Sequence, residues 1–213
     1  VLEESKNGPF KKRIVLVNPF NAPELGFLDE YNIDSCLYIG GPDEVGLDAV
    51  TDILVGKTAP SGHLADTYAY DVEANPSRKN FGNFDYANKD AIINPDSRKY
   101  LVYQEGIYVG YRYFETRYAD YVLGRGNSDS KAGVVSPKGN WRYNEEVQFP
   151  FGYGLSYATF TQTLDDRQVD WNNKTAKATV TVKNNSTNYS AKDVVELYAQ
   201  APYGSGIIEK SAI

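Results

Sequence analysis

The sequence predicts an α/β unit with parallel strands, followed by part of an all-β unit. Three observations support this fold class. Strand-like and helix-like patterns alternate within residues 14–56, a stretch rich in aromatics, glycine and proline occupies residues 149–160, and apolar and polar residues alternate after it. A helix has a period of 3.6 residues and a strand a period of two, so each pattern indicates one type of element.

The first forty residues contain a strand, a helix and a second strand. Residues 14–18 (IVLVN) form a short β-branched run, which is typical of a strand buried on both faces. Residues 23–31 place three large apolar side chains near helical spacing, and residues 36–39 (CLYI) form a second buried strand. A strand, a helix and a strand in this short span predict a βαβ unit and therefore a parallel sheet.

A glycine-rich turn at residues 40–46 leads into a predicted helix over residues 47–56, which Gly56 closes. A turn from strand to helix can hold a phosphate at the helix N-terminus. Here the carboxylates of Asp43 and Glu44 would repel an anion, and the glycine spacing matches no nucleotide-binding motif. The sequence therefore argues against a nucleotide site.

Two long polar stretches, residues 68–98 and 117–146, have loop-like composition. A loop of this length is either functional or poorly ordered. Phe81, Phe84 and Tyr86 lie in the first stretch. In a carbohydrate enzyme such a loop can border the substrate cleft, with aromatic faces stacking on sugar rings.

Residues 176–182 alternate as a half-buried strand does, with four Ala and Val side chains inward and Lys and Thr outward. Residues 193–199 read as the next strand, and residues 184–188 as the turn between the two. These elements predict a region of β-structure after residue 160.

Composition excludes several classes of function. The net charge of −6 and an isoelectric point near 4.9, without a basic stripe, disfavour a nucleic-acid partner. The sequence has no apolar run near the roughly 20 residues that span a bilayer and no signal peptide at its start. It begins at Val1 and contains no methionine, so we expect a fragment of a longer protein.

The single cysteine and the single histidine limit the chemistry further. Cys36 has no second thiol for a disulfide and lies in an apolar run, where a structural thiol is expected rather than a nucleophile. His63 alone cannot form a histidine metal cluster, and no Gly-x-Ser-x-Gly turn accompanies it. We therefore expect no metal, no cofactor and no serine triad.

The junction, defined as residues 149–160, contains five aromatics with two glycines and one proline. Pro150 fixes its own φ, while Gly152 and Gly154 permit backbone angles and close approaches that a side chain would forbid. The rings supply apolar area to hold the junction against a neighbouring surface. Packing for stability is the simplest interpretation of these residues taken singly.

Three segments together resemble family 3 glycoside hydrolases. These segments are the junction (PFGYGLSYATF at 150–160), the turn and helix end (GGPDEVG at 40–46 with DILVGKTAPSGHL at 52–64), and YQEGIYVGYRYF at 103–114. The sequence departs from the family pattern in two places. His63 stands where the family usually carries Lys or Arg, so an anion-pairing role at position 63 is in doubt. Ala65-Asp66 replaces the usual Pro-x.

The resemblance implies that residues 1–158 are the C-terminal part of an α/β sandwich domain with parallel strands. Residues 159–213 would begin a fibronectin type III-like sandwich. Such sandwiches take about 100 residues, so we expect its missing strands from another chain or another part of the protein.

The resemblance also implies a retaining β-glycosidase, β-glucosidase above all, that acts on β-linked oligosaccharides or glycosides. Its aspartate nucleophile and glutamate acid/base would lie outside this chain, with the nucleophile in a barrel domain, so the fragment should be inactive alone. Residues 100–114 form a strand-like aromatic stretch whose charged members are Glu105 and Arg112. These two residues are candidates for an inter-domain clamp or, alternatively, for a direct sugar contact. The rival function is a non-catalytic sugar-binding or scaffolding module.

Overall fold

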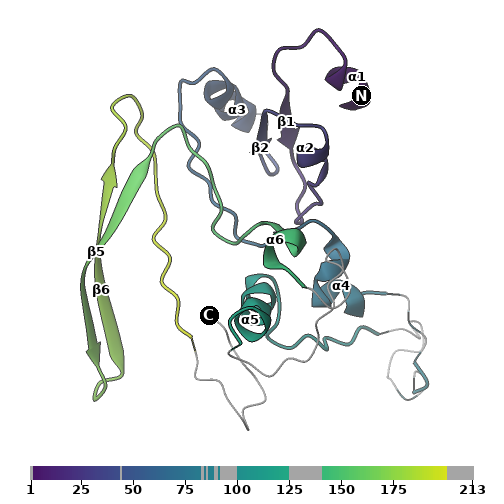
Figure 1. Ribbon diagram of the computed structural model, residues 1–213, viewed down its shortest axis with the longest axis vertical. Helices are drawn as coiled ribbons and strands as arrows, with labels where there is room; N and C mark the ends of the chain where they lie inside the picture. Colours follow the sequence, from purple (N-terminus) through teal and green to yellow (C-terminus); the bar gives the residue numbers. More distant parts are fainter. Residues whose placement is uncertain are drawn as a thin grey trace.

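The computed structural model describes residues 2–43, 45–82, 84, 86–88, 91, 100–124 and 141–200 (Figure 1). The helices are α1 (Leu2–Lys6), α2 (Phe27–Glu30), α3 (Gly46–Leu54), η1 (Val72–Ala74), α4 (Pro76–Asn80), α5 (Tyr111–Tyr121) and α6 (Tyr143–Glu146). The strands are β1 (Ile14–Val17), β2 (Ser35–Tyr38), β3 (Tyr68–Ala69), β4 (Val147–Phe149), β5 (Phe160–Asp170) and β6 (Thr175–Asn184). No described helix combines the length and the apolar character that crossing a bilayer requires.

Strands β1 and β2 pair in parallel, with Ile14 opposite Ser35 and Val17 opposite Tyr38. Helix α2 connects them, so the predicted βαβ unit and parallel sheet are confirmed. Burial of β1 on both faces is wrong for this chain, because Ile14 and Leu16 are 52% and 44% exposed. One face of the two-stranded sheet is left open.

A carboxylate ties the starts of the two strands together. The Lys12 ammonium and the backbone N–H of Arg13 donate to the Asp34 carboxylate at 2.7 and 2.9 Å. The hydrogen bond from Lys12, followed by that from Arg13, holds the pKa of the Asp34 carboxyl below its ordinary value.

We expect the stability of the β1–β2 sheet to depend on pH through this contact. The pKa of Asp34 is lower in the folded chain than in the unfolded chain. The contact therefore stabilises the fold at pH values above the ordinary aspartate pKa of about 3.9, and this stabilisation is lost as the pH falls through the pKa of Asp34 in the folded chain. The difference in melting temperature between the wild type and Asp34→Asn should therefore shrink below about pH 4. An unchanged difference down to pH 2 would refute this linkage.

Helix α3 ends as the sequence predicts. Gly56 has φ +73°, its N–H donates to the Ile53 carbonyl at 3.0 Å, and the Lys57 N–H donates to the Asp52 carbonyl at 2.8 Å. This pair of bonds is a Schellman motif, which satisfies carbonyls that the last helical turn leaves open. Glu44, before the helix, lies outside the described residues.

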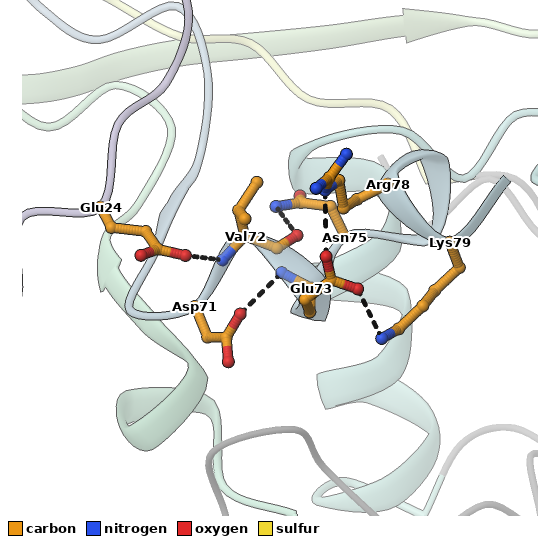
Figure 2. Close-up of polar contacts among 7 residues, drawn as sticks. All are labelled: Glu24, Asp71, Val72, Glu73, Asn75, Arg78 and Lys79. Atoms are coloured by element: carbon orange, nitrogen blue, oxygen red, sulfur yellow. Dashed lines mark hydrogen bonds and ion pairs between the residues drawn. The ribbon is translucent and has the colours of Figure 1, made fainter. Parts of the chain in front are cut away.

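The prediction that residues 68–98 lack structure is wrong for their first part. Strand β3 pairs antiparallel with β4, and η1 and α4 follow it. Figure 2 shows the polar contacts of this segment. The Asp71 carboxylate accepts a hydrogen bond from the Glu73 N–H, and the Glu24 carboxylate accepts one from the Val72 N–H. The Glu73 carboxylate forms ion pairs with Arg78 and Lys79 of α4. Side-chain bonds thus order this segment in addition to the burial of Ala69 and Ala74.

Removing the cap at Asp71 should destabilise this segment. The Asp71 carboxylate accepts the Glu73 N–H at 2.8 Å at the start of η1. We expect Asp71→Ala to cost about 1 kcal/mol in urea unfolding, because the N–H loses its acceptor. Asp71→Asn keeps an acceptor oxygen and serves as the control; equal losses in the two variants would contradict the capping role.

The aromatic stretch at residues 100–114 does not form a strand. Gly110 has φ +58°, and α5 begins immediately after it. Phe114, Tyr118 and Tyr121 recur at helical spacing and place one side of α5 against the core. The core consists of Ala69, Ala74, Phe114, Trp141 and Val147, with Tyr113, Tyr118, Tyr121 and Tyr143 packed around it.

Residues 117–146 also differ from the predicted loop. Their first part belongs to α5 and their last to α6, and residues 125–140 lie outside the described chain. The buried Trp141 explains the packing at this end, because the Arg117 guanidinium lies 5.0 Å from its ring and Tyr121 meets it edge-on.

Strands β5 and β6 form a long antiparallel hairpin that stands apart from the rest of the chain (Figure 1). The predicted strand at residues 176–182 is confirmed within β6, but its inner face is uncovered, with Val182 41% exposed. The predicted strand at residues 193–199 is wrong: residues 185–200 form no helix or strand and run back from β6 towards α5. This segment has no ladder partner among the described residues.

Candidate functional site

The junction docks against the loop that follows α3. The Gly152 N–H donates to the Leu64 carbonyl at 2.8 Å, and the Leu64 N–H donates to the Tyr153 carbonyl at 2.9 Å. Gly152 has φ +77°, and a Cβ on Gly154 would clash with the Gly62 carbonyl oxygen. The prediction that these two glycines provide an unusual backbone angle and a close approach is confirmed.

The aromatic rings of the junction pack on one another and reach two helices. Phe149 packs on Tyr153 with ring centroids 4.9 Å apart, and Phe151 packs on Tyr111 of α5 at 4.6 Å. The Tyr157 hydroxyl donates to the Ile53 carbonyl of α3 at 3.0 Å. These contacts hold the junction between α3 and α5.

His63 faces Asp193 across this docked region. Its Nε2 lies 3.9 Å from an Asp193 oxygen, at the limit of an ion pair and effective only when the imidazole is protonated. The other Asp193 oxygen accepts from the Gln162 amide at 2.8 Å. Position 63 thus faces an anion even though it carries histidine.

A cavity of about 380 Å³ opens beside this pair, with residues of the α3 loop, the junction and the 185–200 segment around it. The Lys192 N–H donates to the Ser61 hydroxyl at 3.1 Å, and the Tyr189 hydroxyl donates to the Gly56 carbonyl at 3.0 Å. Because the Ser61–Lys192 and Gln162–Asp193 bonds join its walls, the cavity is a contact region between segments.

Glu105 and Arg112, the two predicted site residues, lie in different places. Glu105 is half-buried in the turn before α5 and accepts a hydrogen bond from the Asn80 amide at the end of α4. Arg112 is exposed on α5, with its guanidinium carbon 5.7 Å from the Tyr111 ring centroid. The clamp and the sugar contact both stay predictions.

Cys36 lies half-buried in β2, and burial raises the pKa of its thiol. A raised pKa leaves less thiolate at neutral pH, which suits a structural cysteine. Within the part of the chain that the structure describes, no three His, Cys, Asp or Glu side chains gather as a metal site would require.

A family model, the glycosyl hydrolase family 3 C-terminal domain, matches residues 4–111. The chain belongs to glycoside hydrolase family 3. The matched region ends at the first residue of α5, so it includes the parallel sheet, α3 and its loop, and Glu105.

Relatives in family 3 are similar over more of the chain. A β-glucosidase from Ruminococcus albus is 33% identical over 193 residues, which is 91% of this chain and 16% of the relative. An exo-α-(1→6)-L-arabinopyranosidase from Bifidobacterium breve is 28% identical, over 87% of this chain and 18% of the relative. The chain thus spans less than a fifth of these enzymes.

A solved structure extends the likeness to the whole fold. The crystal structure of a β-glucosidase from Paenibacillus barengoltzii superposes with a TM-score of 0.71 and 29% identity, over 99% of this chain and 19% of that one. This likeness fits the α/β part of the predicted fold class, whereas the fibronectin type III-like character of residues 159–213 stays a prediction.

Two groups of residues were missed by reasoning from the sequence. Asp193 had no local signal, because it is far from His63 along the chain. Glu115 and Tyr198 form a second cavity with Tyr111 and Phe151. The four-residue spacing of Tyr111 and Glu115 was a usable signal, since it places both on one face of a helix.

Proposed function

We propose that this chain is part of a retaining β-glycosidase, with β-glucosides as the main substrates, that removes terminal β-linked sugars from oligosaccharides or glycosides. The observation that carries the proposal is similarity to the Ruminococcus albus β-glucosidase over 91% of the chain. A relative named as an exo-α-(1→6)-L-arabinopyranosidase is also similar to this chain, so the assay includes an arabinopyranoside.

The chemistry requires two carboxylates about 5 Å apart, one as the nucleophile and the other as the acid/base. We place both outside this chain, in the larger remainder of the enzyme, with the nucleophile in a barrel domain. The role of this chain is then structural. It packs beside the part of the enzyme that carries the catalytic carboxylates, and it is inactive alone.

We divide the chain at residues 158 and 159, in the docked junction. Residues 1–158 would complete the α/β sandwich domain, and residues 159–213 would begin a fibronectin type III-like domain. The uncovered faces of β5 and β6 support this division, because a lone hairpin exposes unpaired edges that further strands would cover. Glu105 and Arg112 would then lie at or near the contact with the rest of the enzyme.

A chimera tests the proposal. This chain replaces the matching region of the Ruminococcus albus β-glucosidase, and hydrolysis of 4-nitrophenyl β-glucoside, β-xyloside and α-L-arabinopyranoside is measured. We expect the chimera to hydrolyse the β-glucoside fastest, and the same enzyme lacking the region to be inactive.

Folding of the chimera is checked separately by a single cooperative melt and by its elution volume. A chimera that folds but hydrolyses none of the substrates would contradict the proposal. If that chimera and the isolated chain still bind sugar, the non-catalytic module becomes the better account.

A further inference from the structure

A second cavity of about 240 Å³ lies between α5, the junction and the 185–200 segment. Tyr111, Phe151 and Tyr198 supply three aromatic walls, and Glu115 supplies a carboxylate. The Tyr111 ring lies 4.6 Å from that of Phe151 and 6.3 Å from that of Tyr198, which it meets at 69°. The three rings therefore line the cavity at different angles to one another.

A second carboxylate, that of Glu196, lies beside residues that line this cavity. A Cβ on Gly152 would clash with the Glu196 carboxylate, so that group lies against the backbone next to Phe151. Glu196 accepts a hydrogen bond from the Tyr198 hydroxyl, and Glu115 accepts one from the Tyr143 hydroxyl. Each carboxylate is thus held in place by a phenol.

Neither carboxylate is neutralised within the described residues, where the ion pairs involve other acids. Burial and the bond to Glu115 raise the pKa of Tyr143, and burial and the bond to Glu196 raise the pKa of Tyr198. Both phenols remain neutral donors at physiological pH. The acidic side chains of the site are therefore Glu115 and Glu196.

We propose that this cavity binds a guanidinium group, carried by a small molecule or by an arginine side chain. A cation is attracted to the faces of aromatic rings and to carboxylates that have no counter-ion. A guanidinium is planar, weakly hydrated and able to bond a carboxylate through two N–H groups, whereas an ammonium is a compact and strongly hydrated charge.

Two arginines of helix α5 already make the same kind of contact. The Arg117 guanidinium lies 5.0 Å from the Trp141 ring centroid and donates to the Tyr113 hydroxyl at 2.6 Å. Arg112 lies 5.7 Å from the Tyr111 ring centroid and is exposed. The surroundings of α5 therefore suit guanidinium–aromatic pairs, and the inference does not depend on glycosidase activity.

The test is calorimetric titration of the purified chain with N-acetylarginine methylamide. N-acetylcitrulline methylamide is the neutral isostere, and N-acetyllysine methylamide carries an ammonium. We expect binding of the arginine compound and at least about tenfold weaker binding of the other two. No arginine binding, or equal binding of citrulline, overturns the proposal.

Variants then locate the site. Tyr111→Leu removes a ring and should weaken arginine binding about tenfold, whereas Tyr111→Phe should retain it. Glu115→Gln should also weaken it, with Glu196→Gln as the second charge variant if the first does not fold. Tyr103→Leu, at an exposed tyrosine outside the cavity, is the control and should leave binding unchanged. Equal binding by Tyr111→Leu and Tyr111→Phe would overturn the assignment.

A final comparison separates the two sources of the group. Methylguanidinium and a capped Gly-Arg-Gly peptide are titrated into the wild-type chain. Equal affinities would support recognition of the guanidinium of a small molecule, and tighter peptide binding would support an arginine in a protein segment. Binding of neither contradicts the proposal.

Discussion

Replacing Phe114 by alanine should lower the free energy of unfolding of the chain by about 3–5 kcal/mol. Phe114 is fully buried at the centre of the core that joins α5 to β3, η1 and β4. The substitution removes the apolar area of a whole ring and leaves a cavity that close-packed neighbours fill only in part. Urea unfolding followed by tyrosine and tryptophan fluorescence measures the loss.

The matched control is Phe81→Ala, the same change at a side chain that is 65% exposed. An exposed ring has little burial to lose, so we expect this variant to remain within about 0.5 kcal/mol of the wild type. Similar losses in both variants would mean that the core described around Trp141 and Phe114 does not stabilise the chain.

Gly154→Ala should destabilise the junction by about 1–3 kcal/mol. The added Cβ would clash with the Gly62 carbonyl oxygen and would come within 3.0 Å of the His63 ring. A backbone carbonyl cannot turn aside as a flexible side chain can, so the junction and the α3 loop must separate. Faster hydrogen exchange at the N–H groups of Gly152 and Leu64, together with a lower melting temperature, would report the separation.

Gly62→Ala provides the control on the opposite side of the same contact. A Cβ on Gly62 would meet nothing within 4 Å, so this variant should exchange and melt nearly as the wild type does. If the two alanine variants behave alike, the close approach at Gly154 does not hold the junction in place.

Elements with a strong local signal were predictable. The β-branched run of β1 and the glycine at the end of α3 required only neighbouring residues, and both are confirmed. The aromatic content of residues 100–114 is typical of a strand, yet α5 begins at Tyr111. The helical spacing of Phe114, Tyr118 and Tyr121 indicates a helix, but two of these residues lie after the aromatic segment that ends at residue 114.

Other features depend on contacts that no local pattern specifies. Burial of Ile14 depends on what covers the open face of the sheet. The segment at residues 193–199 has the composition of a strand but no ladder partner among the described residues. His63 lies opposite Asp193, which is distant from it in the sequence. The second cavity likewise brings together Glu115, Phe151 and Tyr198 from distant parts of the chain. A single sequence gives no register for such contacts.

The most direct test of the proposed function measures nitrophenol release from 4-nitrophenyl β-glucoside by two proteins side by side. One is this chain alone, and the other is the same chain in place of the matching region of the Ruminococcus albus β-glucosidase. We expect no turnover by the chain alone and clear turnover by the chimera, because we place the catalytic carboxylates outside this chain. Turnover that co-purifies with the chain alone, or a folded chimera without activity, would contradict it.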